Sequence, residues 1–222
     1  MPQLHYFGHA AVGVRDASGS TLVVDPYNPG GFDGKMGYEP IPVQADYAVS
    51  SHEHFDHAAF EDLPGGKPVV VEEGMAGPFE IRRFTFAHDE YAGERFGGDV
   101  EALRIDVDDV SVLHLSDVGQ SPAGAIPARM RGCDVALVPV GGFYTVGAAQ
   151  AWEWTRRLGA RVVIPIHFKT PVCGLPLHRL DPFLTYFSAV VELDDSFVEL
   201  TNALRSFADS VMVIPPSCGE LF

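Results

Sequence analysis

The chain has 222 residues, of which 46% are hydrophobic and 20% are charged, a balance typical of a water-soluble globular protein. We expect one domain over residues 1–222, because a chain of this length buries about 70% of its unfolded surface in a core. Its 30 acidic residues and 15 lysines and arginines give a net charge of -15, which argues against nucleic acid and anionic membranes as partners.

The cysteines and the first residues bear on the cellular compartment. Cys133, Cys173 and Cys218 have no C-x-x-C spacing, so the sequence predicts neither a disulfide framework nor a thiolate zinc site. No apolar run reaches the roughly 18 residues of a membrane helix. The first ten residues lack the basic and apolar regions of a signal peptide. We therefore expect a soluble, cytoplasmic protein.

Five short apolar runs, rich in β-branched residues, are typical of strands buried on at least one face. In chain order they span 21–24, 47–51, 84–87, 111–116 and 161–166. Each run is followed at once by a histidine or an aspartate: Asp25, His52, His88, Asp117 and His167. Residues just past strand ends lie on the rim of a sheet, where binding groups gather. The pattern therefore indicates a functional site at such a rim.

The connections between these runs are of two kinds. Turn-forming residues predict antiparallel hairpins at 15–20, 96–99 and 107–110. A helix is expected at 148–158, with Gly159 as its stop signal. A second is expected at 183–187, with Asp181 and Pro182 as its start signal, and a third after a capping-box pattern that begins at Ser196. A glycine-rich stretch at 27–39 predicts a long loop over a site. Hairpins first and βαβ-like segments later favour an α/β fold of layered sheets with helices outside.

The strongest chemical signal is the run His52-Glu53-His54-Phe55-Asp56-His57. If His52 and His54 continue the preceding strand, its two-residue period puts both imidazoles on one face, about 7 Å apart, where they can hold one ion. Asp56 and His57 then follow at a turn and can serve a second ion. A solvated histidine-rich loop is the alternative. Imidazoles and carboxylates without thiolates suit Zn²⁺, Mn²⁺ or Fe.

The remaining candidates at strand ends extend this ligand set. His88, Asp117 and His167 would bring it to six or seven ligands, enough for two ions roughly 3.5–4 Å apart. Asp117 is the expected bridge, because one carboxylate can offer an oxygen to each ion. Two divalent ions outweigh the two carboxylates of Asp56 and Asp117, so the site can be locally positive and can accept a small anionic substrate.

The run 52–57 resembles the signature of the metallo-β-lactamase superfamily. The surrounding motifs resemble its branch of small metal-dependent hydrolases related to ascorbate-6-phosphate lactonase. They are the segments 7–10, 23–26, 138–145 and 163–167, together with His88 and Asp117. The resemblance implies a four-layer αββα sandwich with the site along one edge of the paired sheets. Ser116 is a departure, because relatives usually carry glycine there.

The resemblance also implies how the ligands are divided. His52, His54 and His88 would surround one ion and Asp56, His57 and His167 the other, with Asp117 shared. A bridging water would become hydroxide near neutral pH and attack a carbonyl or phosphorus centre. Asp56 could orient that hydroxide or pass on its proton, which makes Asp56 and Asp117 the expected catalytic residues.

Four further residues are candidates for supporting or substrate-contacting roles. Asp25 would hydrogen-bond a ligand or its loop. His9, Lys169 and Tyr144 are placed near the motifs, with ordinary structural or surface roles as the alternatives. The function that the sequence favours is that of a two-metal hydrolase that cleaves a small-molecule lactone, ester or phosphoester, with zinc as the preferred metal. An iron-dependent redox enzyme and a non-catalytic metal-binding sensor are the alternatives, and a homo-oligomer is left open.

Overall fold

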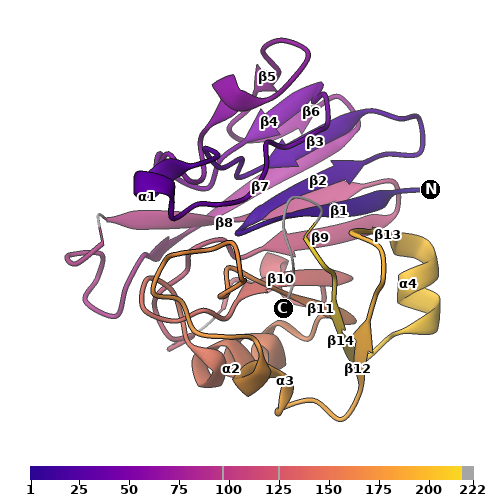
Figure 1. Cartoon of the computed structure of the whole chain (residues 1–222). Coiled ribbons are helices and arrows are strands. Elements are labelled where there is room, and N and C mark those ends of the chain that lie inside the picture. The colour runs from indigo at the N-terminus through magenta and orange to yellow at the C-terminus, as the bar shows by residue number, and fades with distance from the viewer. Residues whose placement is uncertain (97, 125, 217–222) are drawn as a thin grey trace.

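A computed structural model shows two β-sheets packed face to face, and it describes residues 1–96, 98–124 and 126–216 (Figure 1). Within these residues the first sheet has six strands in the spatial order β13 (Phe197–Glu199), β1 (Gln3–Gly8), β2 (Ala11–Arg15), β3 (Thr21–Val24), β4 (Tyr47–Val49) and β5 (Val69–Val70). The first four strands in that order pair antiparallel, and β3, β4 and β5 run parallel.

The second sheet of the described residues has eight strands. Their order is β12 (Val190–Glu192), β14 (Ser210–Val213), β11 (Val162–Ile166), β10 (Val135–Pro139), β9 (Val110–His114), β8 (Asp99–Val107), β7 (Phe79–Ala87) and β6 (Gly74–Ala76). Strands β12 to β9 are parallel, and β9 to β6 are antiparallel. The predicted α/β fold of packed sheets is confirmed.

Side-chain alternation along the strands explains why the first sheet is covered on both faces. In β3, Leu22 and Val24 enter the core between the sheets, whereas Val23 points outward. The outward side chains pack under the 27–45 and 172–177 segments, which contribute Tyr27, Met36 and Leu175. Loops therefore form most of the outer layer on this side.

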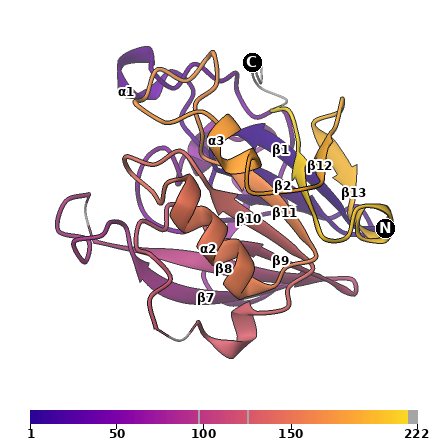
Figure 2. The same cartoon turned by 90° about the horizontal axis from the view of Figure 1, so that it is seen from below.

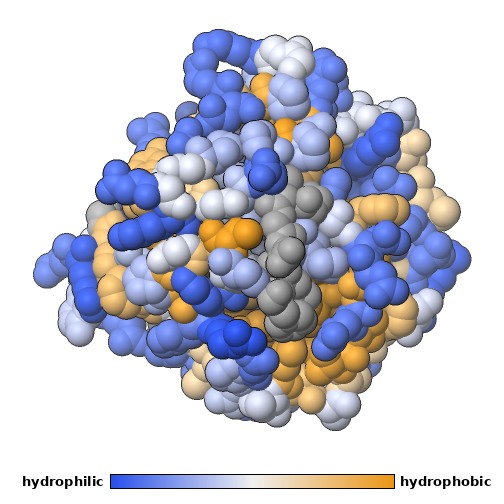
Figure 3. Space-filling model, viewed as in Figure 1, coloured by the Kyte–Doolittle hydropathy of each residue, from blue (hydrophilic) through white to orange (hydrophobic). Residues whose placement is uncertain are grey.

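The part of the chain that the structure describes has few helices, and they lie outside the sheets. They are α1 (Gly31–Gly34), α2 (Ala148–Leu158), α3 (Asp181–Leu184) and α4 (Leu200–Ser206), with 3-10 turns at Phe60–Asp62 and Ala128–Met130. Helix α2 crosses the outer face of the second sheet with α3 beside it (Figure 2). None of these helices is long and apolar enough to span a membrane. Hydrophilic side chains predominate on the face seen in Figure 3, as the net charge predicts.

Several predicted boundaries are confirmed. Helix α2 spans 148–158 and ends at Gly159, whose φ of 62° is a left-handed conformation that glycine adopts at little cost. The turns at 15–20 and 107–110 join antiparallel strands. The third turn, 96–99, is instead the end of a longer connection from Ala87 to Asp99, and its Gly97 lies outside the described residues, as does Cys218.

Three expectations were wrong in detail. Residues 197–199 of the predicted capping box form β13, and the helix starts three residues later than expected. The reason is that Glu199 rather than Ser196 accepts from the backbone N–H groups of Thr201 and Asn202, at 2.8 and 3.1 Å. Helix α3 starts at Asp181 but ends at Leu184, and not at residue 187 as predicted. Finally, β4 ends at Val49, so His52 and His54 lie in a loop and not on a strand.

Candidate metal centre

The candidate ligands meet because strands of both sheets end at the same edge of the sandwich. Asp25 follows β3 and the 52–57 run follows β4, both in the first sheet. His88, Asp117 and His167 follow β7, β9 and β11 of the second sheet. The predicted concentration of polar groups past strand ends is therefore a single three-dimensional cluster.

One histidine group combines the loop after β4 with the end of β7. His52 Nε2 and His54 Nδ1 lie 3.0 Å apart, and the ring centroid of His88 lies 5.0 Å from that of His52 and 5.3 Å from that of His54. One nitrogen of each residue lies within 4.8 Å of the others. The three imidazoles can therefore hold one ion, although the loop, and not a strand period, brings them together.

A second group has His57 and His167 at its centre. Their nitrogens lie within 4.8 Å of one another and of a nitrogen of His9, which the sequence indicated only as a supporting or substrate-contacting residue. His9 Nε2 is also 3.3 Å from Asp56 Oδ2, and His57 Nε2 is 3.8 Å from the same oxygen. Asp56 thus adjoins this group.

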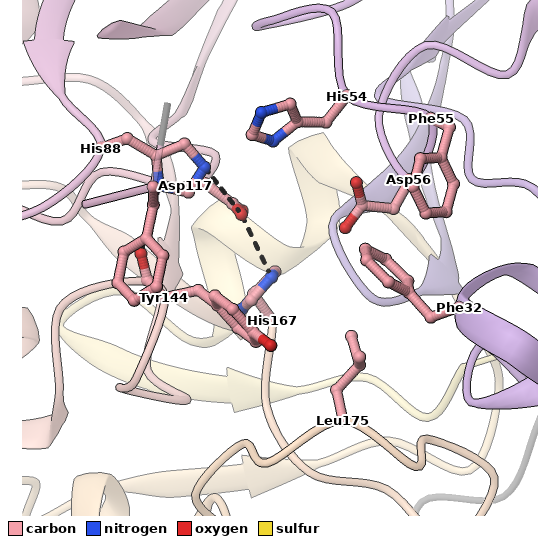
Figure 4. Close-up of a pocket in the computed structure, with 10 residues that line it drawn as sticks. Phe32, His54, Phe55, Asp56, His88, Asp117, Tyr144, His167 and Leu175 are labelled. Carbon is pink, nitrogen blue, oxygen red and sulfur yellow. Dashed lines mark hydrogen bonds and ion pairs between the residues drawn. The ribbon is translucent and has the colours of Figure 1, made fainter. Parts of the chain in front are cut away.

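Asp117 lies between the two histidine groups (Figure 4). Its Oδ2 is 3.3 Å from His57 Nε2, 3.3 Å from His167 Nε2 and 3.7 Å from His88 Nε2. Asp117 is 3% exposed, so these nitrogens and not water are the main polar neighbours of its carboxylate. This is the position expected of a shared ligand.

Unpartnered polar atoms provide a test of whether the cluster fits a cation. Among the described residues, the buried atoms His57 Nε2, Asp56 Oδ1 and Asp117 Oδ1 make no hydrogen bond. Buried polar atoms in native proteins are nearly always hydrogen-bonded or bound to an ion. The donor set is imidazole nitrogen and carboxylate oxygen, which suits zinc, manganese or iron. The residues present therefore fit divalent metal.

Burial and charge set the protonation of the cluster. Burial lowers the pKa of His52 to about 3 and that of His9 to about 4, which leaves both imidazoles neutral, each with one unprotonated nitrogen. Burial also opposes protonation of His57, but the nearby carboxylates of Asp117 and Asp56 outweigh it and raise its pKa well above the usual value. The same negative charges would favour a metal cation at that position.

Asp25, at the end of strand β3, holds the loop that runs from Ser51 to His57. Its carboxylate accepts from the Ser51 N–H at 2.6 Å, the Ser51 hydroxyl at 2.9 Å, the Ser116 hydroxyl at 2.6 Å and the His57 Nδ1–H at 3.0 Å. This bond to Nδ1 leaves Nε2 of His57 facing Asp117. Asp25 therefore contacts and orients a candidate ligand.

The other two supporting candidates occupy different places. The backbone carbonyl of Tyr144 accepts from His88 Nδ1–H at 3.2 Å, while the Tyr144 ring lines the pocket beside the cluster. Lys169 donates to the carbonyls of Cys173 and Leu175, the latter at 2.9 Å. Lys169 therefore stabilises the 172–177 segment, and it is not among the residues that line the pocket.

Apart from Phe32, in the loop expected at 27–39, and the candidate Tyr144, the pocket wall was not predicted from sequence patterns. A cavity of about 230 Å³ opens beside the cluster, and its lining includes Phe32, Phe55, Phe96 and Leu175. Asp89 was also missed: its carboxylate accepts four backbone N–H bonds, at 2.7 to 3.0 Å, from the loop that carries Phe96. An aspartate that opens a glycine-containing loop is a recognisable signal for such bonding.

Comparison with known proteins agrees with this arrangement. Residues 3–167 match the family described as the beta-lactamase superfamily domain. A UPF0173 metal-dependent hydrolase of Methanoculleus marisnigri is 28% identical, covering 98% of this chain and 100% of its own. Its counterpart in Methanoregula boonei is 29% identical over 75% of this chain and 82% of its own.

Solved structures point the same way. A Thermotoga maritima protein assigned as a Zn-dependent hydrolase of the metallo-β-lactamase superfamily is 26% identical to this chain, with a TM-score of 0.69. The match covers 96% of this chain and 100% of that protein. The family match, the paired sheets and the His/Asp cluster agree, and the chain therefore belongs to the metallo-β-lactamase superfamily, as one of its metal-dependent hydrolases.

Proposed function

We propose that the protein hydrolyses a small-molecule lactone, ester or phosphoester with two divalent metal ions, zinc in preference to manganese or iron. The observation that carries the proposal is the position of Asp117 Oδ2, which lies 3.3 Å from nitrogens of His57 and His167 and 3.7 Å from His88. A carboxylate between two imidazole groups is the arrangement that two neighbouring ions need.

The residues divide between the two ions as the motif implies. The proposed ligands are His52, His54 and His88 for one ion, Asp56, His57 and His167 for the other, and Asp117 for both. His9 is a further candidate for the second ion, since its nitrogen lies within 4.8 Å of those of His57 and His167. Asp25 would fix the direction of His57, and the Tyr144 carbonyl that of His88.

Two divalent ions held there would supply Lewis-acid chemistry, because they lower the pKa of bound water and polarise a carbonyl or phosphoryl oxygen. The protein would supply position and proton transfer. Nearby histidines outweigh burial and hold the pKa of Asp56 below its usual value, so its carboxylate stays ionised and can accept a hydrogen bond from the attacking water. In ester hydrolysis one water is consumed: its oxygen joins the acyl carbon, the C–O bond breaks and a proton goes to the leaving alcohol.

Metal analysis and turnover of the purified protein test this proposal. We expect about two ions per chain and metal-dependent hydrolysis of at least one substrate in a panel of lactones, esters and phosphoesters. Asp117→Asn should lower the metal content and reduce kcat/KM by more than about 100-fold, since even outer partners of metal ligands cost 10–100-fold. Glu53→Gln, an exposed acid-to-amide change in the 52–57 loop of the same candidate site, is the matched control.

Other results would point elsewhere. Unchanged metal content and turnover in Asp117→Asn would contradict the proposal. Iron content together with oxygen consumption would favour the redox alternative. Tight metal binding without turnover of any substrate in the panel would favour a sensor.

A further inference from the structure

The pocket beside the candidate ligands has a mainly aromatic wall. Five of its lining residues lie outside the proposed ligand set: Phe32, Phe55, Phe96, Tyr144 and Leu175. Figure 4 shows Phe32 and Phe55 on the side of Asp56, and Tyr144 on the opposite side, near His88. Phe96 lies against Tyr144, with 5.1 Å between ring centroids, and Phe32 lies 4.3 Å from Phe55. Two aromatic pairs therefore flank the space above the candidate metal centre.

The first pair is held at the pocket mouth by unusual backbone. Phe32 has φ of 54°, a left-handed conformation that side-chain-bearing residues rarely adopt. A Cβ at Gly31 would come within 2.9 Å of the Phe55 ring, so a side chain there would displace that ring. Yet Phe32 is 37% exposed and Phe55 49% exposed. Strained backbone that presents apolar rings to water, at the rim of a cavity, is typical of a binding surface.

The same wall lacks cationic side chains. None of the residues that line this pocket, within the part of the chain that the structure describes, is a lysine or an arginine. The Lys169 ammonium is directed at two backbone carbonyls. Arg95 lies over the rings of Phe96 and Phe143, at 4.9 and 5.8 Å, and lines the neighbouring cavity instead. An anionic group placed away from the metal centre would have no charged partner here.

We infer that the site selects an uncharged ester or lactone that carries an aryl or branched alkyl group beside the scissile bond. This inference rests on the proposed function, and it narrows the substrate class within it. The apolar group lies between the Phe32–Phe55 pair and the Phe96–Tyr144 pair, with Leu175 below it. The volume of about 230 Å³ limits it to one ring or a short branched chain.

A set of small substrates measured with the metal-loaded protein tests the inference. Methyl phenylacetate and benzyl acetate are isomers that place the ring on either side of the ester, and methyl acetate lacks it. Monomethyl succinate and phenyl phosphate are the anionic comparisons. We expect kcat/KM for at least one aryl ester to exceed that for methyl acetate, and for both anions, by about 10-fold or more, the gain from burying one ring.

Variants then locate the preference. Phe96→Ala and Phe32→Ala should each lower the ratio of aryl to methyl ester turnover by about 5-fold, because each removes one ring of the facing pairs. Phe197→Ala is the control: this side chain is 48% exposed on β13, and it does not line the pocket. Its ratio should equal that of the unchanged protein.

The outcomes separate this inference from the proposed function. Metal-dependent turnover without aryl preference, or with preference for an anion, would overturn the inference and leave the proposed function standing. If no substrate turns over, the proposed function fails, and saturation-transfer NMR of phenylacetamide against acetamide decides about the subsite. Contact with phenylacetamide alone, weakened in Phe96→Ala, supports the aryl subsite. Equal contact with both amides, or contact that Phe96→Ala does not change, overturns it.

Discussion

Ser116 combines an unfavourable backbone conformation with a buried hydrogen bond to Asp25. Its φ is 48°, in the left-handed region where glycine is favoured. Its hydroxyl lies 2.6 Å from Asp25 Oδ2 and 2.5 Å from the Ser51 hydroxyl. Glycine at this position would fit the backbone without strain, whereas the serine adds a donor to the carboxylate that orients His57. The strain is thus partly offset by a bond that glycine cannot make.

Two substitutions at Ser116 separate these effects. Ser116→Ala removes the hydroxyl but keeps the left-handed backbone, so we expect the free energy of unfolding to fall by about 1–2 kcal/mol. Ser116→Gly loses the same bond but relaxes the backbone, and we expect it to be about 1 kcal/mol more stable than the alanine variant. Denaturant unfolding monitored by circular dichroism measures both. An alanine variant as stable as the unchanged protein would contradict this account.

At the scale of elements, the connection from β7 to β8 forms one wall of the pocket and depends on Asp89. The Asp89 carboxylate accepts from the N–H groups of Tyr91, Gly93, Arg95 and Phe96, at 2.7 to 3.0 Å. These donors outweigh burial and hold the pKa of Asp89 below its usual value. The β7–β8 connection thus has a fixed shape without helix or strand, and the hydrogen bonds to Asp89 hold Phe96 in position.

Replacing Asp89 should loosen this loop selectively. In Asp89→Asn only one oxygen remains to accept hydrogen bonds, so we expect amide hydrogen exchange of residues 91–96 to accelerate by about 10-fold, the result of losing roughly 1.4 kcal/mol of protection. Exchange in the core strands should not change. Glu94→Gln, an exposed acid in the same loop, is the control. Equal exchange in the two variants would show that Asp89 does not hold the loop.

At the scale of the whole molecule, the site joins the two sheets. Asp25 and Asp56 come from the first sheet's strand ends and Asp117 from the second, and all three are buried, at no more than 6% exposure. Burying carboxylates together is unfavourable unless a cation accompanies them. Bound metal would therefore stabilise the packing of one sheet on the other as well as serve the chemistry.

Metal removal should consequently lower the stability of the folded protein. A metal that binds only the native state, present at 100 times its Kd, adds about 2.7 kcal/mol. We expect a lower thermal midpoint with EDTA than with added Zn²⁺, and a much smaller difference in Asp117→Asn, which lacks the shared carboxylate. Scanning calorimetry measures both. An equal midpoint with and without metal in the unchanged protein would contradict the assignment.

Local patterns were sufficient for many elements. Helix α2 was predictable because its apolar spacing, its C-terminal arginines and Gly159 are all local signals. His52, His88 and His167 were predictable because each follows a short apolar run rich in β-branched residues. The start of α4 was not: Ser196 and Glu199 match a capping box, but pairing of β13 with β1 holds residues 197–199 extended. Long-range pairing there overrides the local preference.

The sequence by itself determined the fold class and the chemical type of the site, because strand periodicity and the spacing of His52, His54, Asp56 and His57 are short-range properties. Only the tertiary structure decided which atoms meet. A nitrogen of His9 lies close to those of His57 and His167, and the Asp25 carboxylate accepts hydrogen bonds from Ser51 and Ser116. Phe32 and Phe96 line the same pocket. These partners lie tens of residues apart, and their approach depends on how two sheets and their loops pack, which no local pattern encodes.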